Sequence, residues 1–594
     1  MKTFRRRLLP LLTAAALFSG GCYSLAGKFL GSDPGKPTRV AVEKNLMVPM
    51  RDGVRLATDI YRPAGEGKYP VVITRLPYGT DVSLFEQLSK LFTQNGYVFV
   101  AQDTRGEFDS EGDWFPMLPE YDDGHDTIEW LTRQPWYNGK IGMFGGSYFG
   151  YTQIVSTPDN DHVTCTVPLL ATGSIHKIIF RNGVQELVSI QGWLVGERNA
   201  QLKRAGLPAN LEPDFTGFFN EPVRDARPID FEVARRDPEM IKAGPEAWLK
   251  HPGDSEFMPP LNFDPFYAKV STPALMVAGW YDMFLGAQIN DFIKMRELGA
   301  GNAKKTRLII APMAHGMPTS REGNLLSAIR VLGTSMMQWY DYWLKDKQNG
   351  AADAAPIKLY VMGENVWRDE YEWPLARTRF TEYFLHSGGA ANTAKGDGSL
   401  SARAPGEEPT DRYQYDPRNP APTAGGNFLG KGEWQPGPQD QGNIPLRPDV
   451  LVYMTEPLAV ATEVTGPIKL ILYAASSARD TDWVAKLLDI DEKGKARLLQ
   501  QGVVRARYRD GYQRPSAIEP GKVYEYQLDL WATSNLFQKG HRIALWVTSS
   551  DFPQFDRNSN AAGEGGPDNI IVANQTIYHD SRRPSRLVLP VIPR

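Results

Sequence analysis

The chain carries a glycine-rich turn at residues 141–150, where the sequence reads IGMFGGSYFG. An apolar run ends there in two glycines and Ser147, and a helix-competent stretch, YTQIVST, follows at once. A serine on a sharp turn between a buried strand and a helix presents its hydroxyl at the end of a sheet, and the helix start favours developing negative charge. The usual pentapeptide has glycine two residues after the serine, whereas this chain has Phe149 there and Gly150 next. The turn predicts a nucleophilic Ser147; the alternative is a strand-to-helix turn without chemistry.

Short apolar runs alternate with helix-like segments around this turn, over residues 39–172. In the segments between the runs, apolar residues recur every three or four positions, as in amphipathic helices. This rhythm is typical of βαβ units, in which helices cover a parallel sheet. The runs are YPVVITRLPY, YVFVAQDTRG, KIGMFGG and HVTCTVPLL. The pattern resumes over residues 271–350 with STPALMVAGWYD and TRLIIAPMAHG, so both stretches are expected to form one parallel α/β core.

The length of the chain predicts further domains, because 594 residues exceed what one hydrophobic core supports. Residues 173–270 contain helical pieces and no clear buried strand, which predicts an inserted helical cap. Residues 353–594 contain many turn residues around evenly spaced short strands such as IKLYVMG and HRIALWVTSS, a pattern typical of a β-sandwich or jelly roll. The predicted fold class is α/β, with a parallel α/β core, the inserted helical cap and a C-terminal β-sandwich or jelly-roll domain.

The first 22 residues have the layout of an export signal. Basic residues precede an apolar stretch, Leu8–Phe18, that is too short to span a bilayer, and small residues lead to Cys22. A cysteine at this place resembles a bacterial lipoprotein cleavage site, although Ser19 stands where leucine is usual. We expect an exported cell-envelope protein that contacts a membrane only through a lipid on Cys22; the alternative is an ordinary signal and a periplasmic or secreted protein. The other cysteine, Cys165, lies in an apolar run, so a lipidated Cys22 leaves no disulfide.

Composition and motifs narrow the partners to small molecules. The net charge is −3, and no long basic run occurs after the first residues, so nothing indicates nucleic-acid binding. The acidic run DSEGDW lacks the ligand spacing of a calcium loop, and no metal, nucleotide or other cofactor is expected. The expected partner is a small ester or amide, and the sequence does not predict an oligomeric state.

A serine hydroxyl needs a base to take its proton and a third group to orient that base. In the α/β-hydrolase order the acid and then the histidine follow the serine, each after a strand. Of eight histidines, only His315 follows a core strand, in LIIAPMAHG. Asp282 ends the preceding strand, whereas its rivals Asp264 and Asp291 lie before that strand and inside the next helix, where we expect solvated or helix-capping roles. The predicted triad is Ser147, His315 and Asp282.

An oxyanion hole requires two hydrogen-bond donors aimed at the tetrahedral oxygen. The backbone N–H of Tyr148, directly after the serine, is one candidate. The second is expected from the loop after VVITRLPYG, which has no glycine-rich stretch but carries Tyr78 behind Pro77. The Tyr78 phenol is a candidate donor; the alternative is an aromatic residue at the rim of the site, packed against the cap.

With these residues placed, the chain resembles the cocaine esterase and glutaryl acylase branch of the X-Pro dipeptidyl-peptidase family of α/β-hydrolase serine hydrolases. The resemblance implies an α/β-hydrolase core with an inserted helical cap and a C-terminal β jelly-roll domain. It also implies the triad Ser147, Asp282 and His315, and an oxyanion hole formed by the Tyr148 N–H and the Tyr78 hydroxyl. The main addition from the family resemblance is the role of the Tyr78 hydroxyl in the oxyanion hole. The matching stretches extend from about Val42 to the end of the chain: VPMRDGVRLATDIYRP, RLPYG, QDTRGEFDSEGDW, MFGGSYFG, TPALMVAGWYDMF, APMAHG, VMGENVWRDEYEWPL and FPQFDRNSN.

One departure from the family narrows the substrate. Members that cleave α-amino acid esters carry acidic residues two and three places after the triad aspartate, and this chain has Phe284 and Leu285 there. An ammonium group finds no counter-ion at that spot, which disfavours amino ester hydrolysis and X-Pro peptidase action. Phe284 resembles the aromatic acyl-pocket residue of the cocaine esterase type. Trp193 in IQGWLVG is a candidate partner across the cap, with a packed cap residue as the alternative.

These observations predict a serine esterase that acts on acyl esters, including aromatic ones, through an acyl-enzyme intermediate. An amidase, a β-lactam side-chain acylase or an X-Pro dipeptidyl-peptidase-like activity is the alternative within hydrolases, because the same groups cleave amides when the leaving amine is protonated. A non-catalytic binding protein at the cell surface is the alternative outside them.

Overall fold

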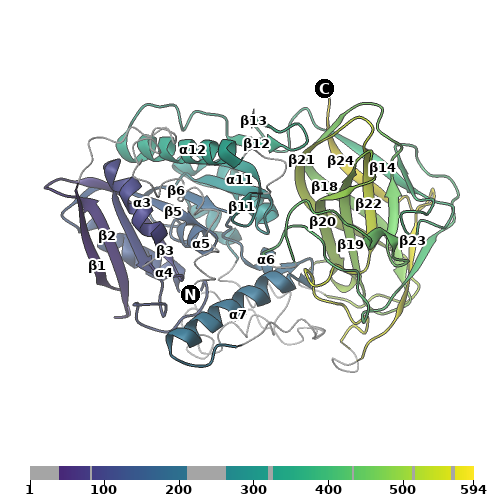
Figure 1. The fold of residues 1–594 in the computed structure, drawn as a ribbon, viewed down its shortest axis with the longest axis horizontal. Coiled ribbons are helices and arrows are strands. Elements are labelled where there is room, and N and C mark those ends of the chain that lie inside the picture. The colour runs from purple at the N-terminus through teal and green to yellow at the C-terminus, as the bar shows by residue number, and fades with distance from the viewer. Residues whose placement is uncertain are drawn as a thin grey trace.

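The computed structural model describes residues 39–80, 83–210, 262–318, 325–430, 434–511, 515–563 and 569–594. Two bodies lie side by side in Figure 1, an α/β domain in purple to teal and a β-rich domain in green to yellow. Cys22, the predicted export signal at residues 1–22 and about half of the predicted cap lie outside the described residues.

The α/β domain is built on one sheet of eleven strands. These are β1 (Val40–Pro49), β2 (Arg55–Pro63), β3 (Tyr69–Leu76), β4 (Val98–Asp103), β5 (Tyr137–Gly146), β6 (Val163–Leu169), β9 (Leu275–Tyr281), β10 (Arg307–Ala314), β11 (Met317–Pro318), β12 (Ile357–Val361) and β13 (Val366–Glu370). Their order is β1-β2-β4-β3-β5-β6-β9-β10-β12-β13, and β11 pairs with β10. Pairing is parallel from β4 through β12 in this order, which agrees with the predicted βαβ rhythm. The parallel strands are buried on both faces, because helices cover both sides of the sheet.

Helices form the outer layers of this domain. Helices α3 and α12 pack on one face of the sheet, and α4, α5 and α11 pack on the other. Most residues of α5 are apolar and all are buried, so this helix lies in the core directly behind the turn at Ser147. The helices are α3 (Ser83–Gln94), α4 (Glu120–Thr132), α5 (Tyr148–Val155), α6 (His176–Ile179), α7 (Leu187–Arg204), α11 (Leu285–Glu297) and α12 (Leu325–Lys345), with 3₁₀ turns at Asp264–Lys269, Gly301–Lys305, Ile444–Leu446 and Ala506–Tyr508.

The described part of the predicted cap follows β6. It contains α6, a hairpin of β7 (Phe180–Arg181) and β8 (Val184–Gln185), and α7. The hairpin differs from the predicted all-helical cap; strands of two residues are too short to leave an alternating pattern in the sequence. Helix α7 begins beside the β-rich domain, where the Leu187 N–H donates to the Gln554 carbonyl, and runs along the lower edge of Figure 1.

The β-rich domain contains a second set of eleven paired strands. Side chains from strands along the whole of this sheet form a single apolar core, so the sheet is folded over upon itself. The jelly-roll topology predicted for this domain stays a prediction. The strands are β14 (Arg379–His386), β15 (Ser399–Ser401), β16 (Asp411–Tyr415), β17 (Leu451–Met454), β18 (Thr462–Ser476), β19 (Asp482–Ile490), β20 (Ala496–Arg505), β21 (Tyr524–Phe537), β22 (Arg542–Thr548), β23 (Ala573–Tyr578) and β24 (Arg586–Ile592).

The predicted boundary at residue 353 differs from the sheet topology. Strands β12 and β13 lie within the predicted C-terminal β region, but they extend the first sheet, where β12 pairs in parallel with β10. A short apolar strand next to a turn has the same local pattern in either sheet, so only the pairing separates them. The second sheet begins with β14.

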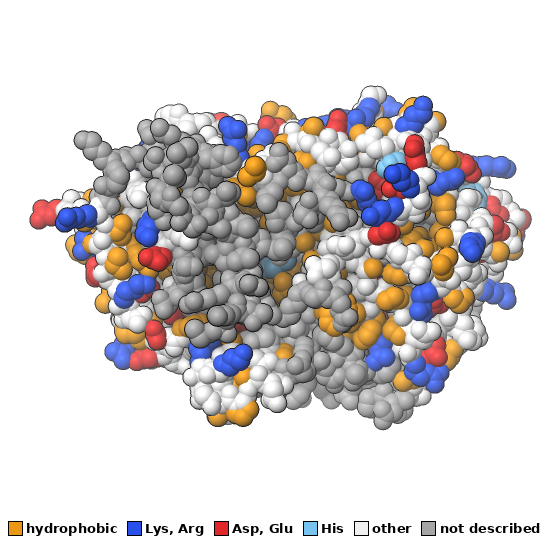
Figure 2. Space-filling view, viewed as in Figure 1, with side chains coloured by type: hydrophobic (Ala, Val, Ile, Leu, Met, Phe, Trp, Pro, Cys, Tyr) orange, Lys and Arg blue, Asp and Glu red, His pale blue; other side chains and the backbone are white. Residues whose placement is uncertain are grey.

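The surface in Figure 2 carries charges of both signs. Lysine and arginine side chains are interspersed with aspartate and glutamate over both domains on this face. Within the described residues, no helix is both long and apolar enough to cross a bilayer. Cys165 lies fully buried in β6, as its apolar surroundings predict.

Candidate active site

Ser147 stands on a strained turn between β5 and α5. Its backbone has φ 56° and ψ −126°, a left-handed value of φ that a non-glycine residue adopts at a cost of about 1–3 kcal/mol. The chain crowds this turn from both sides. A Cβ on Gly145 would lie 2.1 Å from the Phe149 ring, and one on Gly150 would lie 2.5 Å from the Ala171 Cβ. Glycine is therefore required at position 150 because the loop after β6 passes close to α5.

The predicted triad residues meet at the carboxyl ends of three parallel strands. Asp282 follows β9, His315 follows β10 and Ser147 follows β5. The Ser147 Oγ lies 3.0 Å from His315 Nε2, and His315 Nδ1 lies 2.7 Å from Asp282 Oδ2. The Asp282 side chain is fully buried, whereas that of His315 is 12 % exposed. This arrangement lets an imidazole take the serine proton at one nitrogen while the carboxylate holds the other.

The Asp282 carboxylate is itself held in place by the backbone. Its Oδ1 accepts a hydrogen bond of 2.8 Å from the N–H of Phe284, at the start of α11. Its two oxygens thus bind different partners, which fixes the carboxylate plane relative to the imidazole.

The two rival aspartates lie elsewhere. Asp264 forms surface ion pairs with Lys177 and Lys294, as its expected solvated role implies. Asp291 is neither solvated nor a cap: it is fully buried, and its Oδ2 accepts hydrogen bonds from the Thr172 hydroxyl and the Gly173 N–H. Its place inside an amphipathic helix hid this task, because Thr172 and Gly173 lie on a loop more than 100 residues earlier.

Tyr78 lies next to the serine, after β3. Its ring packs edge-on against Tyr148 and Phe149, with centroid separations of 6.4 and 6.3 Å. Its hydroxyl oxygen accepts a hydrogen bond of 3.3 Å from Trp193 Nε1. Burial raises the pKa of the Tyr78 phenol well above its usual range, so the hydroxyl keeps its proton at any working pH. The Tyr78 O–H is therefore available as a donor.

Tyr148 is the first residue of α5, which places its backbone N–H beside Ser147 at the helix N-terminus. Its side chain points into the core. The phenol donates to Glu120 Oε1 at 2.8 Å and accepts from the Met117 N–H at 2.8 Å. These two bonds anchor the start of α5, so Tyr148 offers the site its backbone group rather than its side chain.

Sequence reasoning missed the buried carboxylate behind this anchor. Glu120 lies at the start of α4, is fully buried, and forms an ion pair of 3.1 Å with Arg75. Burial raises the pKa of Glu120 to about 7. An acidic residue in the first turn of a helix is usually a surface residue, so no local signal marked it.

The two predicted pocket aromatics contact different members of the candidate site. The ring of Phe284 lies 5.4 Å from the His315 ring. Trp193, on α7, packs against Tyr148 at 6.2 Å and against Trp114 at 6.1 Å, beside its hydrogen bond to Tyr78. Phe284 thus borders the histidine, and Trp193 borders the two tyrosines.

The β-rich domain contacts the end of β9, the strand that precedes Asp282. Asn427 Nδ2 donates to the Trp280 carbonyl at 2.9 Å, and Gln500 Nε2 donates to the same carbonyl at 2.8 Å. Trp280 is the second-last residue of β9, so both amides hold the strand end that precedes Asp282. Sequence reasoning missed these residues because they lie more than 140 positions from Asp282.

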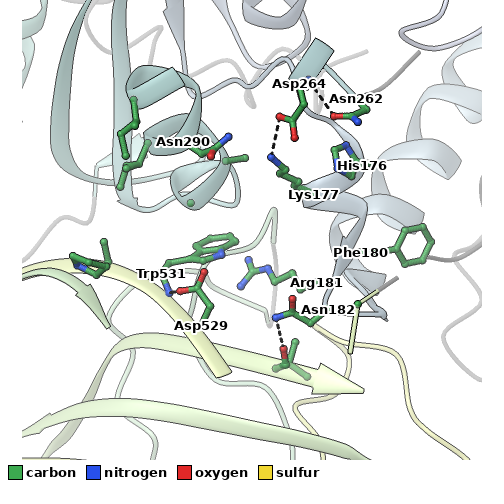
Figure 3. Close-up of a pocket in the computed structure, with 18 of the residues that line it drawn as sticks. His176, Lys177, Phe180, Arg181, Asn182, Asn262, Asp264, Asn290, Asp529 and Trp531 are labelled. Carbon is green, nitrogen blue, oxygen red and sulfur yellow. Dashed lines mark hydrogen bonds and ion pairs between the residues drawn. The ribbon is translucent and has the colours of Figure 1, made fainter. Parts of the chain in front are cut away.

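A separate cavity of about 990 Å³ lies where the two domains meet. Figure 3 shows Arg181 between Trp531 and Asn182 in this cavity, with Lys177 and Asp264 on the opposite wall. The Arg181 guanidinium lies 3.6 Å from the Trp531 ring centroid and forms an ion pair of 2.7 Å with Glu186. Among the described residues, the cavity lining contains no member of the predicted triad.

Comparison with known proteins matches both halves of the chain. Residues 52–317 match the X-Pro dipeptidyl-peptidase (S15 family) domain, and residues 349–588 match the X-Pro dipeptidyl-peptidase C-terminal non-catalytic domain. Cocaine esterase from Rhodococcus sp. (strain MB1 Bresler) is 36 % identical, over 93 % of this chain and 99 % of its own length.

Solved structures show the same architecture. An α-amino acid ester hydrolase superposes with a TM-score of 0.74 at 26 % identity, covering 94 % of this chain and 97 % of its own. An aminopeptidase from a marine sediment archaeon, Thaumarchaeota archaeon, superposes with a TM-score of 0.75 at 24 % identity over the same shares of the two chains. The comparison with the aminopeptidase concerns the fold alone.

Proposed function

Because the chain belongs to the X-Pro dipeptidyl-peptidase (S15) family of serine hydrolases, in the branch that contains cocaine esterase, we propose that it hydrolyses carboxylic esters through an acyl-enzyme on Ser147. The observation that carries the proposal is the pair of hydrogen bonds that links Asp282, His315 and Ser147. A nucleophile with its base and an orienting acid has this arrangement of hydrogen bonds.

In the acylation step, Ser147 Oγ attacks the ester carbonyl carbon while His315 Nε2 takes its proton. The Asp282 carboxylate stabilises the imidazolium that forms. The tetrahedral oxygen accepts hydrogen bonds from the Tyr148 N–H and the Tyr78 O–H, each worth a factor of about 10²–10³ in rate. His315 then donates its proton to the leaving oxygen, and the C–O bond of the ester breaks.

Water completes the cycle by the same groups. His315 takes a proton from water as it attacks the acyl carbonyl, and the proton passes to Ser147 Oγ when the acyl bond breaks. Phe284 beside His315 and Trp193 beside the tyrosines offer aromatic surfaces, which supports acyl esters that include aromatic acyl groups.

Matched 4-nitrophenyl esters and 4-nitroanilides of acetate, butyrate and benzoate test this function. We expect the wild-type protein to cleave the esters faster than the anilides, and Ser147→Ala to lose about four orders of magnitude or more in kcat. Ester turnover that survives in Ser147→Ala would overturn the mechanism. Anilides cleaved faster than esters would overturn the ester assignment in favour of an amidase or acylase.

The sequence also supports export, with the mature chain anchored through a lipid on Cys22. Metabolic labelling with an alkyne fatty acid, followed by fractionation of the cell envelope, tests this proposal. We expect label and membrane association in the wild-type protein and neither in Cys22→Ala. A labelled Cys22→Ala protein, or an unlabelled wild-type protein in the soluble fraction, contradicts the anchor.

A further inference from the structure

A buried aspartate at the end of the neighbouring strand holds the loop that carries Tyr78. Asp103 is the last residue of β4, which pairs in parallel with β3, and it is only 1 % exposed. Its Oδ1 accepts a hydrogen bond of 2.9 Å from the Thr80 N–H. Thr80 lies two residues after Tyr78, so the carboxylate binds the same loop that presents the phenol.

The backbone of this loop is bonded to the end of β4 on both sides of Tyr78. Before it, the Leu76 carbonyl accepts a hydrogen bond of 3.0 Å from the Thr104 N–H. After it, Gly79 turns the chain with a φ of 87°, and the Thr80 N–H then points to the carboxylate. Residues 77–80 thus form a short bridge between two fixed points, and the second of these points is a side chain.

The Asp103 carboxylate is itself held by the loop that follows β4. The Ser110 hydroxyl donates to the Asp103 carbonyl at 2.7 Å. Burial raises the pKa of the Asp103 carboxyl to about 7, although hydrogen bonds from the N–H groups of Asp109 and Thr80 act in the opposite direction. The charges of Asp59 and Asp109 add to the rise. A carboxylate is costly to bury, so its bonds to two loops beside the site indicate a task beyond packing.

Other groups hold the outer side of the loop and the tip of the phenol. A Cβ on Gly79 would lie 2.5 Å from the Phe108 ring, so this ring covers the loop closely. The Arg204 guanidinium, at the end of α7, lies 4.2 Å from the centroid of the Phe108 ring. Trp193, on the same helix, donates to the Tyr78 hydroxyl. The cap therefore contacts the phenol and the outside of the loop, whereas the buried carboxylate holds the backbone from the inside.

We propose that Asp103 is a positioning residue of the oxyanion hole, whose carboxylate fixes the loop of Tyr78 and thereby the distance between the Tyr78 hydroxyl and the carbonyl attacked by Ser147. The inference rests on the proposed esterase function. Asp103 acts through Tyr78 rather than on the substrate. An oxyanion donor must lie about 2.7–3.1 Å from the tetrahedral oxygen, so a small movement of the loop weakens this hydrogen bond while the nucleophile, base and acid stay in place.

The test compares 4-nitrophenyl benzoate with O-4-nitrophenyl thionobenzoate, in which sulfur, a weak hydrogen-bond acceptor, replaces the carbonyl oxygen. The ratio of kcat/KM for ester to thionoester, each divided by its rate of alkaline hydrolysis, reports on the oxyanion hole, because both substrates use the same base and leaving group. We expect a wild-type ratio of about 100 or more, lowered about tenfold in Asp103→Ala. Asp113→Ala, an exposed aspartate in the same loop, is the matched control and should keep the wild-type ratio.

A second variant keeps the test decisive if Asp103→Ala does not fold. Asp103→Asn has the same shape, but its amide accepts at one atom only and meets the second N–H with a donor, so we expect the ratio to fall about threefold. A wild-type ratio near one, or a ratio that Asp103→Asn and a folded Asp103→Ala leave unchanged, would overturn the inference. Equal losses of kcat/KM on both substrates would also overturn it, because they would indicate general damage.

A double variant shows whether Asp103 acts through Tyr78. Tyr78→Phe should lower the ratio by itself, and Tyr78→Phe/Asp103→Asn should lower it no further. A further fall in the double variant, or an unchanged ratio in Tyr78→Phe, would overturn the inference. Ser147→Ala separates these failures from failure of the proposed function: if it still hydrolyses the ester, the acyl-enzyme mechanism fails, whereas an inactive Ser147→Ala with an unchanged ratio in Asp103→Asn refutes only the role of Asp103.

Discussion

At the scale of single residues, the proposed mechanism uses one hydroxyl group, that of Tyr78, as a hydrogen-bond donor. The Tyr78 phenol is buried beside Trp193, and its raised pKa keeps it a donor. Tyr78→Phe removes this donor and keeps the ring contacts with Tyr148 and Phe149. We expect kcat for ester hydrolysis to fall about 10²–10³-fold, because one oxyanion donor is lost in the transition state.

Two measurements distinguish the loss of a hydrogen-bond donor in Tyr78→Phe from a packing defect. KM and the melting temperature of Tyr78→Phe should stay close to those of the wild type. Tyr78→Phe with full activity would mean that the phenol is only a rim aromatic, the alternative that the sequence left open.

The order of residues along the chain predicted the three members of the candidate triad. The order of serine, acid and histidine after three strands predicted Ser147, Asp282 and His315, and the structure brings all three together. It did not predict the burial of Glu120 or Asp291, because burial of a charged helical residue depends on partners from other elements rather than on local pattern. Cys22 stays a prediction from the sequence.

At the scale of elements, the end of β9 depends on the neighbouring domain. Gln500, on β20, and Asn427 both donate to the Trp280 carbonyl, two residues before Asp282. We expect Gln500→Ala and Asn427→Ala each to lower kcat by about 10–100-fold, since small displacements of a catalytic group carry large rate costs. Both are positioning residues, because neither contacts the reacting atoms.

A general loss of folding would give a different pattern from this prediction. Asn392→Ala removes exposed amide hydrogen bonds in the same domain and should leave kcat unchanged. In Gln500→Ala the loss should fall on kcat rather than KM, because the end of β9 that carries Asp282 is displaced while the substrate pocket is kept. Wild-type kcat in both variants would show that β9 holds Asp282 without help.

The elements themselves were predictable where periodicity is strong. The parallel strands and amphipathic helices of the α/β core follow the predicted rhythm. The sequence pattern does not show that β12 and β13 belong to the first sheet, because local periodicity does not identify a pairing partner. It does not predict the β7–β8 hairpin either, because strands of two residues leave no periodic signal.

At the scale of the whole molecule, the two domains share buried polar contacts. The Gln185 N–H donates to Asp556 Oδ1 at 2.8 Å, and Gln554 Nε2 donates to Glu186 Oε1 at 3.0 Å. Separating the domains would expose these groups and the strand end before Asp282. We therefore expect one cooperative calorimetric transition, with loss of esterase activity at the same temperature. Two separate transitions, with activity surviving the first, would contradict this dependence.

The proposed mechanism of the whole protein requires a covalent acyl-enzyme intermediate at Ser147. Rapid mixing with 4-nitrophenyl benzoate, acid quenching and peptide mapping by mass spectrometry measure it directly. We expect a burst of one nitrophenolate per chain and a benzoyl group on the peptide that contains Ser147, with neither in Ser147→Ala. Nitrophenolate release without acylated Ser147, or a benzoyl group on another residue, would contradict the account.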